Sequence, residues 1–342
     1  MALKKKFTGY LLIAAIALLL SNVIIDLIKK PEKHEIVNEL TVRQIDSVFN
    51  FVLKEYGIDS AWISTKKLKI ADEDSINKQY VVMLPSDLPI PLIIRDINKI
   101  IEKDITGFVS EEKKIFGTTE IRIYTNEILK LQASLIADPN TVRQRNNFAF
   151  IISDAFELGE TDYNKFLYLP YTLSVAVVPG ETVPVKADTL NKFSKEYIAL
   201  INNEISGDKF KLEPGDQKAL LKRSVDMIVK SLNKSQLFVV DEQSKIFNST
   251  VYNFVRDEFK KKGKKLVHLS EFIKLGAGDE TELISKFKFH CEGINEAKQK
   301  IFYLPYEDFL TIRAEVEKAR KRGSRVIPLS STVLVKNIKQ QK

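Results

Sequence analysis

The spacing of apolar residues changes character near residue 140. Before that point, apolar residues recur every three or four positions or alternate with polar ones, as in amphipathic helices and half-buried antiparallel strands. These patterns predict a small α+β domain over residues 41–138, with Gly57 closing its first helix. The expected elements are helices at Val42–Tyr56 and Ile90–Glu102 and strands at Tyr80–Leu84, Glu120–Tyr124 and Ile128–Leu135.

After that point, short segments are apolar without alternation, which is typical of strands covered on both faces of a parallel sheet. Helical segments fall between them, and this alternation predicts an α/β barrel or a doubly wound sheet over residues 139–342. Strands are expected at 148–152, 173–178, 197–201, 237–240, 265–269, 301–303 and 326–327, and helices at 216–232, 249–261, 280–300 and 306–322.

A run of 19 residues without a charged side chain lies near the amino terminus, from Phe7 to Ile25. As a helix it would measure roughly 28 Å, enough to cross the hydrocarbon core of a bilayer. No small-x-small cleavage site follows it, which favours an uncleaved anchor over a cleaved signal peptide. We expect a cytoplasmic tail at 1–6, a transmembrane anchor at 7–28 and a linker at 29–40. The flanking charges favour a cytoplasmic amino terminus, with the bulk of the chain periplasmic or otherwise extracytoplasmic in a bacterial cell envelope.

The charge balance is basic, because 53 Lys and Arg residues against 45 Asp and Glu residues give a formal net charge of +8. Such a charge suits an anionic lipid or polymer, but we expect a dispersed Lys-rich surface, with Lys260–Lys265 as a solvated helix terminus. No Arg-aromatic motif indicates nucleic acid, and no GxGxxG or Walker A pattern indicates a nucleotide. The single Cys291 leaves no Cys pair for a zinc site.

Six segments after residue 147 resemble, in order, the divergent polysaccharide deacetylase family, a branch of the metal-dependent carbohydrate esterases. The first resembles the family's opening strand, which ends in Asp-Asp, and the others resemble its Leu-Pro, His-x-x-Met-Glu, Phe-x-x-Asp-Ser, Gly-His-Pro-Tyr and closing segments. The residues before them, YVVMLPSDLPIPLIIRDINKII, are similar to a small domain found ahead of some members. The six segments are FAFIISDAFELG, FLYLPYTLSVAVVPG, EYIALINNEI, QLFVVDEQS, IFYLPYEDFL and GSRVIPLSSTVL.

The resemblance implies an irregular (β/α) barrel of the polysaccharide deacetylase type, preceded by the small α+β domain and one amino-terminal transmembrane helix. The family's reaction uses a divalent metal such as zinc, held by one Asp and two His, with a second Asp as general base. The metal polarises the acetyl carbonyl and lowers the pKa of its bound water, and the base removes the proton.

This chain departs from the family at most of those positions. Asp154 matches the metal-binding Asp, but Ser153 stands at the position of the base, and a hydroxyl cannot serve that role. Two of the family's His positions fall at Leu200 and Leu304, although Glu204 matches the family's acid. The family's Asn-Asn-His-Met-Gly-Ser segment should lie between Lys211 and Gln236, where this chain has no His. The resemblance therefore implies that the metal ligands are lost, and we expect no cofactor, no complete metal site and no intact catalytic set.

Four residues remain candidates for an altered site: Asp154, Asp241, Glu204 and His268. Asp154 and Asp241 each follow a buried strand, where α/β enzymes place their chemistry. A carboxylate at such a position also caps a helix or binds loop amides. His268, near a strand end, could meet Asp154 or Asp241, and the alternative is a structural, hydrogen-bonded histidine.

The leading hypothesis is a membrane-anchored cell-envelope pseudoenzyme that binds a cell-wall glycan or an envelope protein, or serves as a scaffold. Tyr163, Tyr168, Tyr171 and Tyr306 then either line a glycan groove or pack inside the fold. An active carbohydrate esterase with relocated catalytic residues is an alternative, and it predicts that the four candidate residues converge in one pocket. A structural subunit of a membrane complex is another alternative.

Overall fold

The computed structural model describes residues 40–68, 76–115, 117–143, 146–276, 278–292 and 299–340. The expected tail and anchor, and all but the last residue of the linker, lie outside these described residues. Among the helices that are described, none has both the length and the apolar character needed to span a membrane. The chain divides into two compact units, Met1–Leu53 with Asp59–Thr141 and Lys54–Ile58 with Val142–Lys342.

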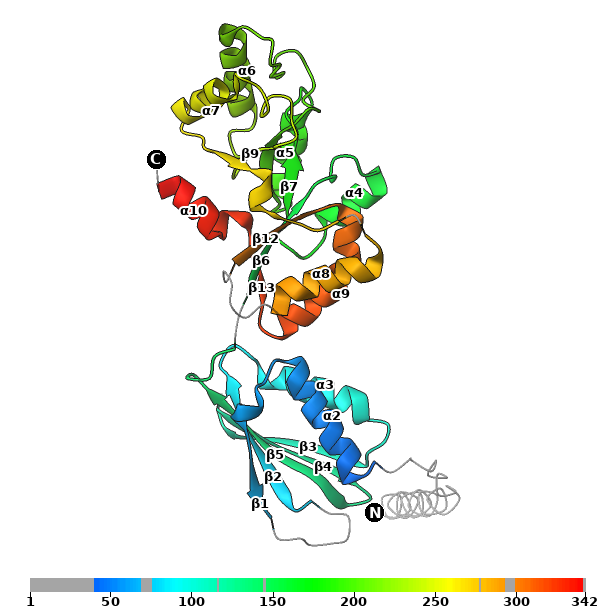
Figure 1. Ribbon diagram of the computed structural model, residues 1–342. Coiled ribbons are helices and arrows are strands. Elements are labelled where there is room, and N and C mark those ends of the chain that lie inside the picture. The colour runs from blue at the N-terminus through cyan, green and yellow to red at the C-terminus, as the bar shows by residue number, and fades with distance from the viewer. Residues whose placement is uncertain are drawn as a thin grey trace, which may run out of the picture. The chain divides into compact units, whose positions relative to one another are not determined.

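The first unit is a five-stranded sheet with two helices on one face (Figure 1). Its strand order is β1-β2-β5-β4-β3, in which β2 and β5 are parallel and the other pairs are antiparallel. Its elements are α2 (Val42–Glu55), η1 (Ser60–Trp62), β1 (Ile63–Lys67), β2 (Lys78–Pro85), α3 (Ile90–Ile101), β3 (Gly107–Lys114), β4 (Thr118–Thr125) and β5 (Ile128–Asp138).

The helices α2 and α3 bury the apolar stripes that the sequence predicts. Phe49 of α2 lies 5.0 Å, centroid to centroid, from the ring of Tyr80 on β2, and Ile93 and Ile97 of α3 are fully buried. All five elements expected in this unit are thus confirmed. The edge strands β1 and β3 were not expected, because their exposed, mostly polar residues carry no alternating pattern.

The second unit alternates strands and helices, as expected for an α/β fold. Its described elements are β6 (Asn147–Ile152), α4 (Glu160–Leu167), β7 (Ser174–Val177), α5 (Val183–Lys192), β8 (Glu196–Ile201), α6 (Lys218–Ser231), β9 (Phe238–Val240), α7 (Tyr252–Lys261), β10 (Leu266–His268), η2 (Leu269–Glu271), β11 (Ile273–Lys274), α8 (Glu280–Glu292), β12 (Gln299–Leu304), α9 (Tyr306–Lys321), β13 (Arg325–Val326), η3 (Leu329–Ser331) and α10 (Val333–Gln340).

The eight strands form one parallel sheet in the order β10-β9-β8-β7-β6-β12-β11, with β13 paired to β6. The edge strands β10 and β11 follow each other in the chain, and the short connection between His268 and Ile273 spans at most roughly 18 Å. The two edges of the sheet must therefore approach each other. This curled, incompletely closed sheet is the barrel-like alternative rather than the doubly wound one.

Apolar residues cover both faces of the curled sheet, as continuous apolar strands predict. The convex face packs Phe150 and Phe302 against the helices, and the concave face is filled by smaller residues such as Ala149 and Ile198. Figure 1 shows α8 and α9 on one side of β6 and β12 and α10 on the other. Val335 of α10 belongs to the concave-face cluster.

Two hydrogen bonds fix the segment before α10 at the amino ends of the strands. The Ser330 N–H donates to Glu196, the first residue of β8, at 2.9 Å, and the Val333 N–H donates to Gln299, the first residue of β12, at 2.7 Å. The amino end of the curled sheet is thus covered by α10. The carboxyl ends of the strands form the opposite end, which we call the mouth.

Three expectations for this unit are wrong in detail. The helix expected at 280–300 is described only to Glu292, and Gln299 already belongs to β12. The closing strand lies at Arg325–Val326, one residue before the expected 326–327, and the segment after it forms α10, whose apolar spacing was not recognised. The short helix α5 begins at Val183 with a proline next to it and was also not expected.

Candidate functional site

The mouth gathers the polar residues that follow the parallel strands. Ser153 and Asp154 come directly after β6, Asn202 to Glu204 after β8, and Asp241 and Glu242 after β9, while His268 ends β10. Because the carboxyl ends of parallel strands meet at one edge of a sheet, all four candidate residues lie at this end of the fold.

Asp154 caps the helix that follows β12. Its Oδ1 accepts a hydrogen bond of 2.8 Å from the backbone N–H of Tyr306, the first residue of α9. Pro305 precedes that residue and has no side chain able to cap the helix, so the aspartate supplies the missing acceptor from another strand. The carboxylate also lies where the helix dipole favours negative charge. Of the two roles weighed for Asp154, the structure shows the capping one.

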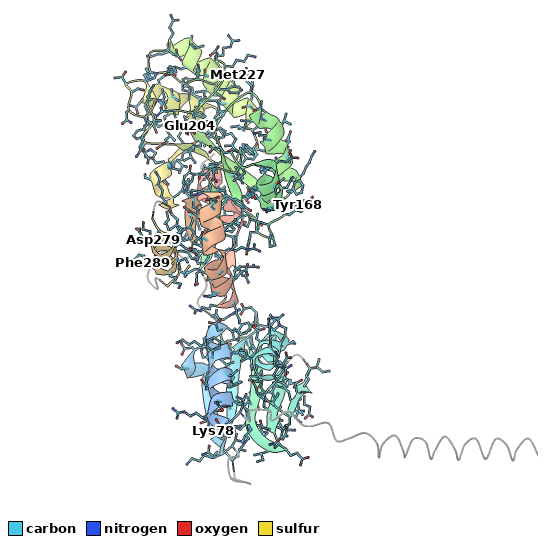
Figure 2. The ribbon with its side chains drawn as sticks, turned by 90° about the vertical axis from the view of Figure 1, so that its right-hand side faces the viewer. Lys78, Tyr168, Glu204, Met227, Asp279 and Phe289 are labelled. Carbon is cyan, nitrogen blue, oxygen red and sulfur yellow. The ribbon has the colours of Figure 1, made fainter. Side chains whose placement is uncertain are left out.

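Asp241 and Glu204 shape the loops in which they lie. Asp241 Oδ1 accepts from the Gln243 N–H at 3.0 Å, which forms a tight turn after β9. Glu204, labelled in Figure 2, accepts from the Asn202 side-chain amide at 2.9 Å, and the Asn202 carbonyl oxygen accepts from the Glu204 N–H at 3.0 Å. Both carboxylates therefore hold their own loops.

Tyr303, which was not among the candidate residues, is a group whose pKa is raised by all three candidate acids. It lies on the concave face, one position before the end of β12, and pairs in register with Ile151 of β6. Burial, followed by the negative charges of Asp241, Glu204 and Asp154, raises the pKa of Tyr303 to about 12. The alternation of IFYL, with Phe302 and Leu304 on the convex face, was the signal that could have found it.

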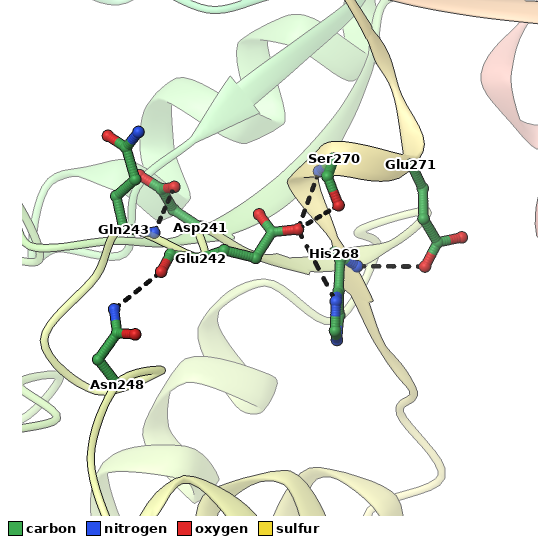
Figure 3. A network of polar contacts seen from close by, with 7 residues as sticks. All are labelled: Asp241, Glu242, Gln243, Asn248, His268, Ser270 and Glu271. Atoms are coloured by element: carbon green, nitrogen blue, oxygen red, sulfur yellow. Dashed lines mark hydrogen bonds and ion pairs between the residues drawn. The ribbon is translucent and has the colours of Figure 1, made fainter.

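His268 pairs with Glu242, a residue that was not among the candidates (Figure 3). Its Nδ1 lies 3.7 Å from Glu242 Oε1, and the ring packs edge-on against Phe247. Glu242 Oε1 also accepts hydrogen bonds from the Ser270 N–H and hydroxyl. Burial raises the pKa of Glu242, but the Ser270 hydrogen bonds and the nearby His268 outweigh it and leave that pKa lowered. The partner is therefore neither Asp154 nor Asp241.

The two positions aligned with histidines of the family, Leu200 and Leu304, carry packed leucines. Leu200 lies on the concave face of β8, whereas Leu304 is fully buried on the convex side among Phe302 and Phe309. Within the described part of the chain, no three His, Cys, Asp or Glu side chains come together as a metal site needs. The residues at the mouth thus do not fit the metal that the resemblance implies.

A small pocket lies beside the candidate acids, between the loops after β8 and β9. Its volume is about 40 Å³, and none of the four candidate residues lines it. The Asn203 side-chain oxygen accepts from the Lys245 N–H at 2.8 Å, which holds the two loops together. The lining residues are Asn202, Asn203, Ile205, Lys211, Leu212, Glu213, Lys245 and Ile246.

Of the four tyrosines considered for a glycan groove, only Tyr168 is well exposed, at 75%. Tyr171 and Tyr306 are buried in the convex-face core, and Tyr163 packs against that core beside Phe166. Packing inside the fold is therefore the better interpretation for these three. Tyr168 lies edge-on to Phe193, with the ring centroids 5.2 Å apart.

Comparisons with known proteins give structural neighbours only. No protein-family model and no curated protein matches the chain. The chain is similar to an uncharacterized protein from Agrobacterium tumefaciens C58, with 15% identity over 56% of this chain and 91% of that chain and a TM-score of 0.37. It is also similar to a CE4 family pseudoenzyme from Bacillus anthracis, with 10% identity over 68% of this chain and 92% of that chain and a TM-score of 0.38. A mutant of that pseudoenzyme with restored enzymatic activity is 10% identical over 68% of this chain and 96% of that chain, with a TM-score of 0.38.

At TM-scores of 0.37 and 0.38, the likeness carries no argument about the site or the activity of this chain.

Proposed function

We propose that this chain is a cell-envelope pseudoenzyme whose deacetylase-like unit binds a glycan at its mouth without hydrolysing it. The observation that carries the proposal is that the strand-end carboxylates already serve the fold. Asp154 caps α9, Asp241 closes a turn and Glu204 is bonded to Asn202. The uncharged run from Phe7 to Ile25 supports a membrane anchor at residues 7–28, with the amino terminus cytoplasmic.

Hydrolysis needs a base that is free to take a proton and an electrophile that stabilises the developing charge. At the mouth, Asp154 accepts from a backbone N–H that must stay bonded for α9 to begin there. His268 is oriented by Glu242, on a different side of the β9 loop from the turn that Asp241 closes (Figure 3). No hydrogen bond or ion pair joins any two of Asp154, Asp241, Glu204 and His268, all of which the structure describes. The convergence that an active esterase requires is therefore not met.

The same residues suit the binding of a sugar. The Asn202 and Asn203 side chains line a pocket of about 40 Å³, which has room for a water-sized group but not for a sugar ring. A glycan would therefore lie across the pocket, with its hydroxyl groups toward the side-chain amides, which both donate and accept hydrogen bonds. The Tyr303 ring contributes an aromatic, half-buried surface on the concave face. The three acids around it favour hydroxyl and amine donors over negatively charged sugars. A neutral or amino-sugar glycan is the ligand class that this chemistry accepts.

Binding of chito-oligosaccharides to the full chain in detergent, measured by isothermal titration calorimetry, tests the proposal. Asn202→Ala and Tyr303→Phe each remove a polar group from the mouth and are expected to weaken binding about five- to tenfold. Asn253→Ala, an exposed position on α7, serves as the matched control and should leave the affinity unchanged. The proposal fails if the full chain binds none of these oligosaccharides, or if the mouth variants bind as tightly as the control.

A further inference from the structure

The net charge of the chain is concentrated on α6 and α7, contrary to the dispersed surface expected from the sequence. Between Lys218 and Ser231, and between Tyr252 and Lys265, there are ten basic and three acidic side chains, a net charge of +7 out of +8 for the whole chain. The remainder is close to neutral. Nine of the ten basic residues are exposed, and Lys264 is half-buried.

The two helices lie side by side, so their charges form one surface (Figure 1). Lys262, directly after α7, forms an ion pair of 2.7 Å with Asp226 of α6. That hydrogen bond, aided by the charges of Lys222 and Lys230, lowers the pKa of Asp226. Lys222 and Lys230 of α6 and Lys262 after α7 therefore all act on one aspartate. Lys218 of α6 also lies over the ring of Phe254 of α7, 5.6 Å from its centroid.

Apolar side chains lie among these charges. Leu220 is 44% exposed in the first turn of α6, between Lys218 and Lys222, and Met227, labelled in Figure 2, is half-buried about two turns further on. Helices that rest on a bilayer present basic residues to the headgroups and insert such apolar residues between them. A soluble polyanion would offer nothing to Leu220.

We propose that the α6–α7 surface docks onto a bilayer of anionic phospholipids, as a second contact besides the expected anchor. An anchored chain would hold the surface near lipid at a high effective concentration, so modest electrostatic attraction suffices. The proposal is independent of glycan binding, since it uses neither the mouth nor its pocket.

The test places an environment-sensitive fluorophore on α6 of the full chain, reconstituted into vesicles. Ala219→Cys is exposed on α6 between Lys218 and Leu220, and Cys291→Ser removes the other thiol. The vesicles are pure phosphatidylcholine or contain about one third phosphatidylglycerol, and both carry a quencher at the headgroup. A label at Asn337→Cys on α10 reports on a face outside the proposed surface.

The fluorophore at position 219 is expected to be quenched on phosphatidylglycerol vesicles, not on phosphatidylcholine, and to be released by about 0.5 M salt. The variant Lys222→Gln, Lys230→Gln, Lys260→Gln should lower the bound-to-free ratio roughly a hundredfold. The matched control Lys192→Gln, Lys274→Gln, Lys336→Gln has the same net charge and should keep the quenching.

Three results would overturn the proposal. They are equal quenching on both lipid compositions, an equal loss in the control variant, and quenching at position 337 that matches the signal at 219. The proposal would also be contradicted if a long-chain polyphosphate released the surface from the vesicles and Leu220→Ser left the quenching unchanged. Those two results together would assign the surface to a soluble polyanion.

Discussion

Replacing Asp154 should destabilise the second unit, because the residue caps α9 rather than serving chemistry. Its Oδ1 accepts a hydrogen bond of 2.8 Å from the Tyr306 N–H, and α9 runs from there to Lys321 and packs in the convex-face core. Asp154→Ala removes both the acceptor and the negative charge at the helix start, with an expected loss of about 1.5 kcal/mol. Asp154→Asn keeps an acceptor and loses only the charge, so about 0.5 kcal/mol is expected.

Urea unfolding of the full chain can separate the two units, because the only tryptophan, Trp62, lies in η1 of the first unit. Trp62 fluorescence therefore follows the first unit, while far-ultraviolet circular dichroism follows both. For a unit of this size, a loss of about 1.5 kcal/mol should lower the urea midpoint by about 0.5 M. Asp154→Ala should shift the dichroism transition of the second unit and leave the Trp62 transition unchanged.

A catalytic or metal-binding Asp154 would give the opposite pattern. Polar groups held for chemistry are commonly strained, and replacing them often leaves stability equal or higher. An unchanged or raised midpoint for Asp154→Ala would therefore refute the capping role. A midpoint for Asp154→Asn as low as that for Asp154→Ala would show that charge, rather than the hydrogen bond, carries the effect.

Three further predictions concern Lys195, Glu242 and Val335 in the second unit. Lys195 is buried and donates to the carbonyl oxygens of Leu169 and Tyr171, and burial lowers its pKa from 10.5 to about 8. Between pH 8 and pH 10 the unfolded chain then binds more protons than the folded chain, so the unfolding free energy rises with pH by at most about 3 kcal/mol. Lys195→Met should abolish this rise, as measured by urea unfolding at several pH values. The lowered pKa of Glu242 means that its contribution is present above about pH 4.5 and is lost as pH falls through the folded-state value. Glu242→Gln should therefore lower the unfolding free energy by about 1 kcal/mol at pH 7, and the difference in unfolding free energy between the variant and the natural chain should become smaller below pH 4. A difference that stays constant with pH would contradict the stabilising role of ionised Glu242. Val335 of α10 is fully buried against the concave face, so Val335→Ala should lower the unfolding free energy of the second unit by about 1–3 kcal/mol, whereas the exposed Val333→Ala should change it little.

Hydrophobic spacing was sufficient to locate most elements, because each of those segments buries one face or both. The stripe on α2 and the unbroken apolar run of β6 leave little choice of structure. The edge strands β1 and β3 were missed for the converse reason, since their residues are exposed and need no apolar pattern. The extent of α8 was overestimated because Gly293, which directly follows the last described residue of the helix, was not taken as a stop signal.

The site was less predictable, because its contacts join residues far apart in the chain. The sequence placed Asp154 after a buried strand, but its bond to Tyr306 depends on β6 and β12 being neighbours. The pairing of His268 with Glu242, rather than with Asp241, depends on which of these two neighbouring side chains points toward the carboxyl end of β10. The charge of α6 and α7 was visible in the sequence, but only their packing shows that it forms one surface.

We propose above that the mouth binds a glycan without the machinery to cleave it. The most direct measurement is made on one preparation of the full chain, incubated with an N-acetylated chito-oligosaccharide, with acetate release and bound zinc or nickel quantified together. We expect saturable oligosaccharide binding, no acetate above the level of a heat-denatured sample, and metal well below one equivalent. Acetate release that scales with protein, together with about one equivalent of tightly bound metal, would contradict it.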